Sequence, residues 1–233
     1  MHRPTADRSS SEPRLHLGNW VTLAIVSAVL LTTLALLAVL DSFAQSYARK
    51  ETEERLKQLA WQMRDTLNRG LAERQIDMQV IAGLEQITDA VDPAHARNIF
   101  NSLQKAYPHY AWIGLAELDG KVFAATRGLL EGKQVDERPW FQQGRKTLYT
   151  GDYHPAVLLQ QKLPDVGEPW RFVDISLPVY RADGQVRGVL GAHLSWSWAR
   201  ELGSNLFGPT KTHYAAEVLI VRNDSQVLLE IGR

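Results

Sequence analysis

The 24 residues from Arg171 to Leu194 read RFVDISLPVYRADGQVRGVLGAHL. Two mainly apolar runs flank Asp183-Gly184, and Asp-Gly in this position is a strong signal for a β-hairpin. The same pattern surrounds Asp119-Gly120 in AWIGLAELDGKVFAAT and Asn223-Asp224 in EVLIVRNDSQVLL. We therefore expect three hairpins, the first two of them in one antiparallel sheet.

A helix is expected just before the first hairpin. Asp92-Pro93 combines an N-cap residue with a proline at the first helical position. The apolar residues that follow recur at helical spacing until Pro108; they are Ala96, Ile99, Phe100, Leu103 and Tyr107. Helices beside an antiparallel sheet define an α+β fold.

The N-terminal region predicts a membrane anchor. Residues 20–40, WVTLAIVSAVLLTTLALLAVL, carry no charge, and a helix of this length spans roughly 30 Å, the thickness of a bilayer core. A cleaved signal peptide is the alternative, with Ser42-Phe43-Ala44 as a possible cleavage site. Signal-peptide apolar regions are usually only about 7–15 residues long, so we expect a retained transmembrane helix.

The flanking charges give the expected orientation. Arg3, Arg8 and Arg14 precede the apolar segment, whereas Arg49 and Lys50 follow it among several acids. The positive-inside rule then places residues 1–19 in the cytoplasm, as a disordered tail, and residues 41–233 outside the inner (cytoplasmic) membrane, in the periplasm.

A long stalk helix is expected over residues 41–91, because apolar residues recur three and four apart across Gly70 and Gly83. A helix from about residue 42 to residue 90 would be on the order of 70 Å long. Its apolar stripe within residues 56–71 is the expected face of a homodimer.

The remaining boundaries follow from the hairpins. Residues 92–195 form the sheet domain, and residues 196–210 a connecting helix or linker, with a helix from about Ser195 to Leu202 in which Trp196 and Trp198 pack the joint between modules. The third hairpin, within residues 211–233, cannot form a stable domain alone. We expect it to begin a second module, truncated here, of a longer protein.

Composition excludes several classes of function. Lys+Arg and Asp+Glu both number 26, so the chain lacks the basic excess of a nucleic-acid-binding protein, and there are no cysteines to form disulfides or thiolate metal sites. The chain has no nucleophile-elbow, zinc-protease or phosphate-loop motif. We predict no catalytic residue, no cofactor and no enzymatic activity within it.

The irregular segment from Arg127 to Trp170 is long enough to suggest a functional loop. It contains VDERPWFQQG, residues 135–144. Arg138 offers a planar fork suited to a carboxylate or phosphate, and Trp140 a flat wall for a ligand. Alternatively, Trp140 fills the core and Arg138 pairs with Asp136 or Glu137.

Four further polar residues are candidates. Asp152 and His154 are two apart, so on a strand both would face the same side. Asp174 and His193 interrupt apolar strands and need partners if buried. They could pair with each other, contact a ligand or bind a divalent metal, and these alternatives stay open.

Arg138-Pro139-Trp140-Phe141 matches the R-x-W-[YF] element on the pocket loop of double Cache domains, and Ser176–Leu194 is similar to their closing strands. Residues 42–233 thus resemble the PAS-like double Cache sensor domains of bacterial transmembrane receptors. The amino-acid sequences of segments such as AWIGLAELDGKVFAAT and GAHLSW look most like those of Cache domains joined to GGDEF diguanylate cyclases. No GGDEF motif occurs in these 233 residues. The resemblance implies that residues 92–195 form the distal, ligand-binding module and that residues 211–233 begin the membrane-proximal one.

Departures from the family pattern bear on the ligand. In members that bind amino acids, a tyrosine five residues before the arginine and an aspartate on the last strand help to hold the ligand. Here these positions are Lys133 and His193, and Phe141 replaces the usual tyrosine. The acid that would neutralise an ammonium group is missing, which makes a carboxylate or another anion paired with Arg138 at least as plausible a ligand as an amino acid.

The expected function is extracytoplasmic sensing of a small molecule, with Arg138, Trp140, Phe141, Asp152, His154, Asp174 and His193 as ligand-binding residues and a diguanylate cyclase as output. The sensor of a chemoreceptor or histidine kinase is an alternative. A membrane-anchored metal-dependent hydrolase using the four Asp and His residues is another, and a module whose cavity is filled by its own side chains is a third.

Overall fold

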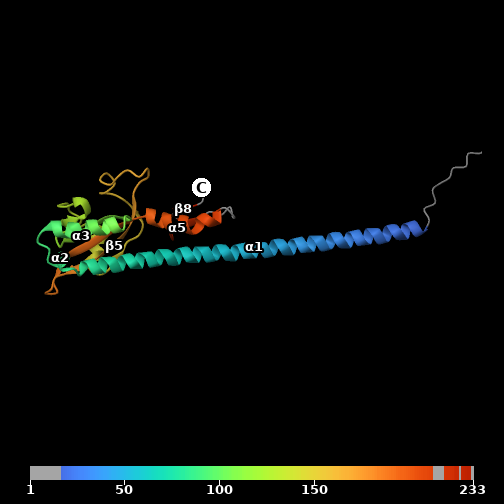
Figure 1. Cartoon of the computed structure of the whole chain (residues 1–233), viewed down its shortest axis with the longest axis horizontal. Coiled ribbons are helices and arrows are strands. Elements are labelled where there is room, and N and C mark those ends of the chain that lie inside the picture. Colours follow the sequence, from blue (N-terminus) through green and yellow to red (C-terminus); the bar gives the residue numbers. More distant parts are fainter. Residues whose placement is uncertain (1–16, 212–217, 226, 232–233) are drawn as a thin grey trace, which may run out of the picture. The chain divides into compact units, whose positions relative to one another are not determined.

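The computed structural model describes residues 17–211, 218–225 and 227–231 (Figure 1). The chain divides into two compact units, the first ending at Gln58 and the second beginning at Leu59. Most of the expected N-terminal tail, residues 1–16, lies outside the described residues.

Helix α1 (Leu17–Ala82) is continuous over 66 residues and contains both the predicted anchor and most of the predicted stalk. By length and composition it is the one helix among the described residues that could cross a membrane. It ends at Ala82, so the expectation that Gly83 would not end it is wrong. The Leu84 N–H bonds to the Ile81 carbonyl three residues back, and Leu84 is extended (φ −72°, ψ 134°) before the short helix α2 (Glu85–Thr88).

Helix α3 (Pro93–Ala106) confirms the predicted capping signal. The Asp92 side chain accepts a hydrogen bond of 2.9 Å from the Ala94 N–H, with Pro93 at the first helical position. Ala96 and Phe100 are fully buried on the inner face of the helix. Capping and amphipathic spacing together fix both where this helix begins and which side it buries.

The main sheet is antiparallel throughout, which confirms the predicted α+β class. The strand order is β2-β1-β6-β5-β3, and β4 also pairs with β5. The strands are β1 (Tyr110–Glu117), β2 (Val122–Ala125), β3 (Tyr149–Thr150), β4 (His154–Pro155), β5 (Arg171–Tyr180) and β6 (Val186–Ser195). The first two predicted hairpins are therefore confirmed and join through β1 and β6.

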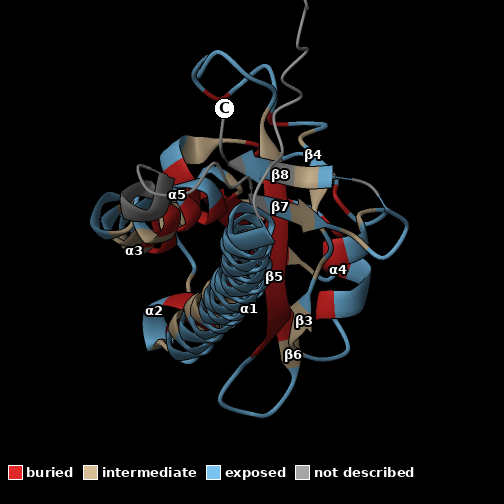
Figure 2. Cartoon of the chain, turned by 90° about the vertical axis from the view of Figure 1, so that its right-hand side faces the viewer, coloured by how far each residue is buried: buried red, intermediate tan, exposed pale blue. Residues whose placement is uncertain are grey.

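Strands β5 and β6 are buried along most of their length, and β5 is drawn red, as buried, in Figure 2. Their successive side chains point to opposite faces and belong to two separate cores. On one face, Ile175, Leu177, Leu190, Ala192 and Leu194 pack with Met78 of α1 and Phe100 of α3. On the other, Phe172 and Val189 pack with Trp112, Trp140 and Leu159. We call these the helix-covered face and the loop-covered face.

The loop-covered face lies under residues 126–170, which are less irregular than predicted. They include the 3-10 turn η1 (Thr126–Gly128) and helix α4 (Pro139–Gly144). Pro139 begins α4, as its fixed φ favours. The Ser176 hydroxyl of β5 donates a 2.7 Å hydrogen bond to the Trp140 carbonyl and fastens α4 to the sheet.

Helix α5 (Ser197–Lys211) begins later and runs much further than expected, and it occupies the predicted linker. Trp198 is buried against α1, where its ring lies so close to Gly70 that a Cβ there would be 2.3 Å away. The Trp196 indole N–H donates to the Leu228 carbonyl (3.1 Å). The third hairpin, β7 (Val218–Val221) with β8 (Val227–Ile231), is confirmed as a separate two-stranded sheet. That it begins a second module stays a prediction.

The apolar stripe of α1 differs from its expected role over part of its length. Met63 is buried, and Leu67 and Leu71 pack against the core under the helix-covered face. This part of the stripe therefore stabilises the fold of its own chain.

Candidate functional site

A cavity of about 470 Å³ lies on the loop-covered face, within the size range of small-molecule sites. Its walls are mostly aromatic and aliphatic. Trp112, Tyr149, Tyr153 and Phe172 contribute rings. Six acidic, basic or histidine side chains also line it: Arg138, Asp152, His154, Asp174, His193 and Arg222.

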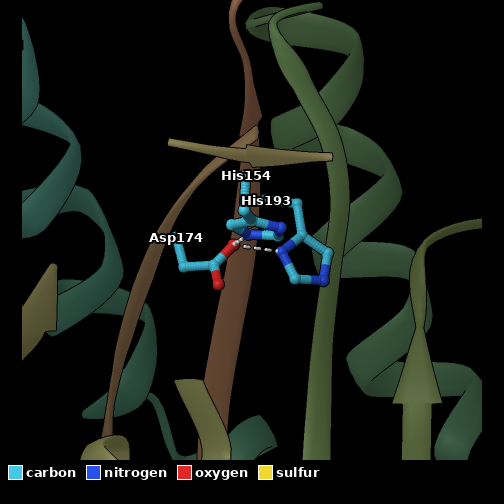
Figure 3. Close-up of side chains that lie close together, drawn as sticks. All are labelled: His154, Asp174 and His193. Atoms are coloured by element: carbon cyan, nitrogen blue, oxygen red, sulfur yellow. Dashed lines mark hydrogen bonds and ion pairs between the residues drawn. The ribbon is translucent and has the colours of Figure 1, made fainter. Parts of the chain in front are cut away.

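Three of these meet at one carboxylate. Asp174 Oδ1 lies 2.8 Å from His154 Nε2 and 2.5 Å from His193 Nδ1 (Figure 3). Asp174 and His193 are directly opposite in the β5–β6 register, so they share a face of the sheet. His154 pairs with Phe172, two residues before Asp174 and therefore on the same side. We call His154, Asp174 and His193 the polar trio.

The trio is strongly coupled electrostatically. Burial alone would raise the pKa of Asp174, but the charge of His193 and the hydrogen bonds from both histidines outweigh it and hold that pKa at about 2. The hydrogen bond with Asp174 raises the pKa of His154 against the opposing effect of burial. Asp174 is thus an ionised carboxylate at neutral pH, although its side chain is only 6% exposed.

Aromatic rings hold His193 in place. Its imidazole stacks between Trp112 and Phe172, with ring centroids 5.1 and 5.2 Å away and interplanar angles of 29° and 17°. Trp112 is itself fixed by a 2.9 Å hydrogen bond from its indole N–H to the Leu129 carbonyl. The orientation of His193 toward Asp174 is therefore built into the packing.

Arg138 lines the cavity at the N-terminus of α4. Its guanidinium makes no hydrogen bond or ion pair with any described residue, so the alternative pairing with Asp136 or Glu137 does not occur in this part of the chain. Its charge opposes the net rise in the pKa of His154 that the hydrogen bond with Asp174 causes. The cavity wall thus carries a half-buried cation that has no counter-ion among the described residues.

Trp140 and Phe141, the two aromatic residues that follow Arg138 and Pro139, differ in their position relative to the cavity. Trp140 is 4% exposed and contributes its ring to the cavity wall, above Gly191 of β6. Phe141 is 1% exposed, packs in the core and does not line the cavity. Its role as a ligand-binding residue stays a prediction that the cavity lining does not support, because consecutive helical residues point in different directions.

Asp152 lines the cavity but does not join the trio. It is exposed and precedes β4, so it does not share a strand face with His154 as expected. Its Oδ2 is instead 3.5 Å from the Arg222 guanidinium, which also bonds Asp224. The four polar candidates therefore divide into three that converge and one that is exposed and faces Arg222.

Sequence reasoning missed Trp112, Tyr149, Tyr153, Phe172 and Arg222 as lining residues. Trp112 lies directly across from His193 in the β1–β6 register. The apolar sequence of β1 does not indicate that Trp112 contacts His193, because the pairing of β1 with β6 is a long-range contact. Arg222 comes from the turn of the third hairpin, far along the chain.

No family model and no curated protein matches the sequence significantly. Many solved structures do match in fold. The ligand-binding domain of the Pseudomonas aeruginosa amino-acid chemoreceptor PctC, in complex with GABA, aligns with a TM-score of 0.57 at 18% identity, over 76% of this chain and 74% of that one. The sensor domain of the Vibrio cholerae histidine kinase DctB aligns with a TM-score of 0.59 at 12% identity, over 76% and 66%.

An extracellular ligand-binding receptor from Desulfohalobium retbaense aligns with a TM-score of 0.59 at 13% identity, over 75% of this chain but only 32% of the receptor. The present chain thus spans about a third of that receptor and about two thirds to three quarters of the two sensor domains. At these identities the likeness concerns the fold. The α+β domain has the Cache-type fold of ligand-binding sensor domains.

Proposed function

We propose that this chain is the extracytoplasmic sensing region of a transmembrane receptor and that its cavity binds an anionic small molecule, with a carboxylate as the leading class. One observation carries the proposal. The Arg138 guanidinium has no counter-ion among the described residues and lines a largely apolar cavity of about 470 Å³ in a Cache-type fold. A carboxylate would supply the missing partner in bidentate geometry.

The charges of the cavity favour an anion over an amino acid. The buried carboxylate, Asp174, already contacts two histidines. Asp152, the other acid of the lining, faces Arg222. A ligand ammonium group would find no uncommitted carboxylate among these, whereas the aromatic walls suit an apolar ligand body.

The surrounding architecture completes the proposal. Residues 20–40 cross the inner membrane, residues 1–19 are cytoplasmic and residues 41–233 are periplasmic. Residues 92–195 are the distal ligand-binding module, 196–210 the connection and 211–233 the start of a membrane-proximal module. Two chains associate through α1, on which Trp61, Ile76 and Val80 stay exposed. Ligand would bias the packing of the sheet on α1, which requires different affinities in two states.

We propose that the output domain is a cytoplasmic GGDEF diguanylate cyclase, because segments such as GAHLSW resemble the sequences of Cache domains joined to that enzyme. A chemoreceptor or histidine kinase output fits equally well, because the neighbours in fold include both kinds of sensor. Sequencing the gene beyond codon 233 discriminates between these outputs.

Thermal-shift screening tests the ligand class. The chain, in detergent, is heated with apolar-bodied carboxylates and with their amide and amine counterparts. A carboxylate at 100 times its Kd should stabilise by about 2.7 kcal/mol. Arg138→Ala should abolish this shift. Arg145→Ala is the matched control, because Arg145 lies at the other end of α4, exposed and outside the cavity. Hits that survive both Arg138→Ala and Trp140→Ala would overturn the site.

A further inference from the structure

His154 presents both ring nitrogens to hydrogen-bond acceptors. Nδ1 is 3.0 Å from the Pro155 carbonyl oxygen, and Nε2 is 2.8 Å from Asp174 Oδ1. A carbonyl only accepts, so Nδ1 must carry a hydrogen. In a neutral imidazole, Nε2 would then aim a lone pair at a carboxylate. A divalent cation shared by Nε2 and Asp174 Oδ1 would satisfy both atoms.

The rest of the trio fits the cation. His193 Nδ1 faces the same carboxylate oxygen, and the three candidate ligand atoms all lie within 4.8 Å of one another. Two imidazoles and one carboxylate are a donor set that zinc and similar transition metals use. The contact from His154 Nδ1 to a backbone carbonyl is the outer-shell contact that usually fixes a metal-bound histidine.

We propose that His154, Asp174 and His193 bind one divalent transition-metal ion of the zinc class at the floor of the cavity. This goes beyond sensing of an anion: the metal would have three protein ligands and an open position toward the cavity, where water or an anion binds. A site for Mg²⁺ or Ca²⁺ would need mostly oxygen ligands, whereas this trio offers two nitrogens.

Little movement is required for binding. Ligand atoms about 2.0–2.1 Å from a tetrahedral zinc ion are roughly 3.3 Å apart. The present separations from Asp174 Oδ1, 2.8 and 2.5 Å, would therefore widen by less than about 1 Å. His193 is already clamped by its stacked neighbours, and the half-exposed His154 is on a two-residue strand, where such a shift disturbs little.

The test uses the chain in detergent, stripped with a chelator and dialysed. Zn²⁺ is titrated by calorimetry, and Co²⁺ is followed by visible absorption, which reports ligation by the protein directly. One equivalent should bind. His154→Gln and the nearly isosteric Asp174→Asn should each weaken affinity by more than about 100-fold, beyond the 10–100-fold typical of losing an outer-shell partner.

His95→Gln is the matched control, since His95 also faces an aspartate (Nδ1 to Asp92 Oδ2, 3.9 Å) but is exposed on α3. It should bind as the wild type does, and circular dichroism confirms that each variant is folded. Failure of Zn²⁺ and Co²⁺ to bind the wild type, or equal binding by His154→Gln, overturns the metal site. Carboxylate binding that depends on Arg138 would survive that result, so the two proposals fail separately.

Discussion

The two faces of the sheet are built from alternate residues of the same strands but differ in the buried polar side chains that they carry. On the helix-covered face, β5 and β6 present Ile175, Leu177, Leu190 and Leu194, all within one apolar core. On the loop-covered face the same strands present Asp174 and His193. Because successive side chains of a strand point to opposite faces, one pair of strands supports the fold on one side and a site on the other.

The segments that pack on each face explain this difference. Helices α1 and α3 lay continuous apolar stripes on the sheet and leave Phe100 and Met78 with no exposed surface. Residues 126–170 cross the other face with only short elements, η1, α4, β3 and β4, and enclose a cavity of about 470 Å³. A segment with so little regular structure can supply a half-buried Arg138 and an aromatic wall without satisfying a helix-packing pattern. Whether a face of the sheet can hold buried polar side chains therefore depends on the segment that packs on it: α1 and α3 on one face, residues 126–170 on the other.

The largest expected effect breaks the helix-covered face. Phe100→Ala removes a fully buried ring from α3 and should cost about 3–5 kcal/mol of unfolding free energy. In chemical denaturation the midpoint should fall sharply. Carboxylate affinity measured well below that midpoint should stay within about twofold, since Phe100 is on the opposite side of the sheet. A large loss of affinity with an intact fold would contradict the separation of the faces.

A smaller effect is expected where the loop cover touches the sheet. A Cβ on Gly191 would lie 2.6 Å from the Trp140 ring, so Gly191→Ala should displace Trp140, destabilise the fold by about 1–3 kcal/mol and weaken ligand binding. Gly83→Ala is the control, because its Cβ would meet nothing closer than 3.6 Å. If Gly191→Ala binds ligand normally, Trp140 does not shape the cavity.

The smallest effect concerns an ion pair between α3, which packs on one face of the sheet, and the segment of residues 126–170, which packs on the other. Glu131 of the loop segment accepts from Arg97 of α3 at 2.6 and 2.8 Å and from the Ala125 N–H. Burial opposes ionisation, but these contacts outweigh it and lower the pKa of Glu131. Because the folded pKa is depressed, its stabilisation is present above the unfolded value of about 4.3 and is lost as pH falls through the folded value.

Glu131→Gln should therefore cost about 0.5–1 kcal/mol at neutral pH, as for a mostly solvent-screened pair. The gap between variant and wild type should close below about pH 4. Urea denaturation at several pH values measures it, with the exposed Glu137→Gln as control. A gap that persists at pH 3 would assign the effect to packing.

Local signals predicted much of the fold. Asp-Gly turns marked two hairpins of the sheet, and Asp92-Pro93 marked the start of α3, because each rests on neighbours in the chain. The end of α1 was missed: apolar spacing continues past Gly83 to Ile87, although the backbone turns there. Helix α4 was missed because six residues are too few to show a period.

The site was less predictable for the same reason. Arg138, Trp140, His154, Asp174 and His193 could be selected as unusual residue types in their surroundings, and they do line the cavity. The contacts that give them chemistry are long-range. That His193 stacks on Trp112 depends on the β1–β6 pairing, and that Asp152 faces Arg222 depends on the third hairpin.

Hydrogen exchange tests most directly whether the loop-covered face is the ligand side. The chain would be compared with and without the most stabilising carboxylate from the thermal screen. We predict that exchange slows most within residues 127–170, including α4, and that α3, residues 93–106, changes little. Slowing that is greatest in α3, or no slowing anywhere with ligand bound, would contradict the account.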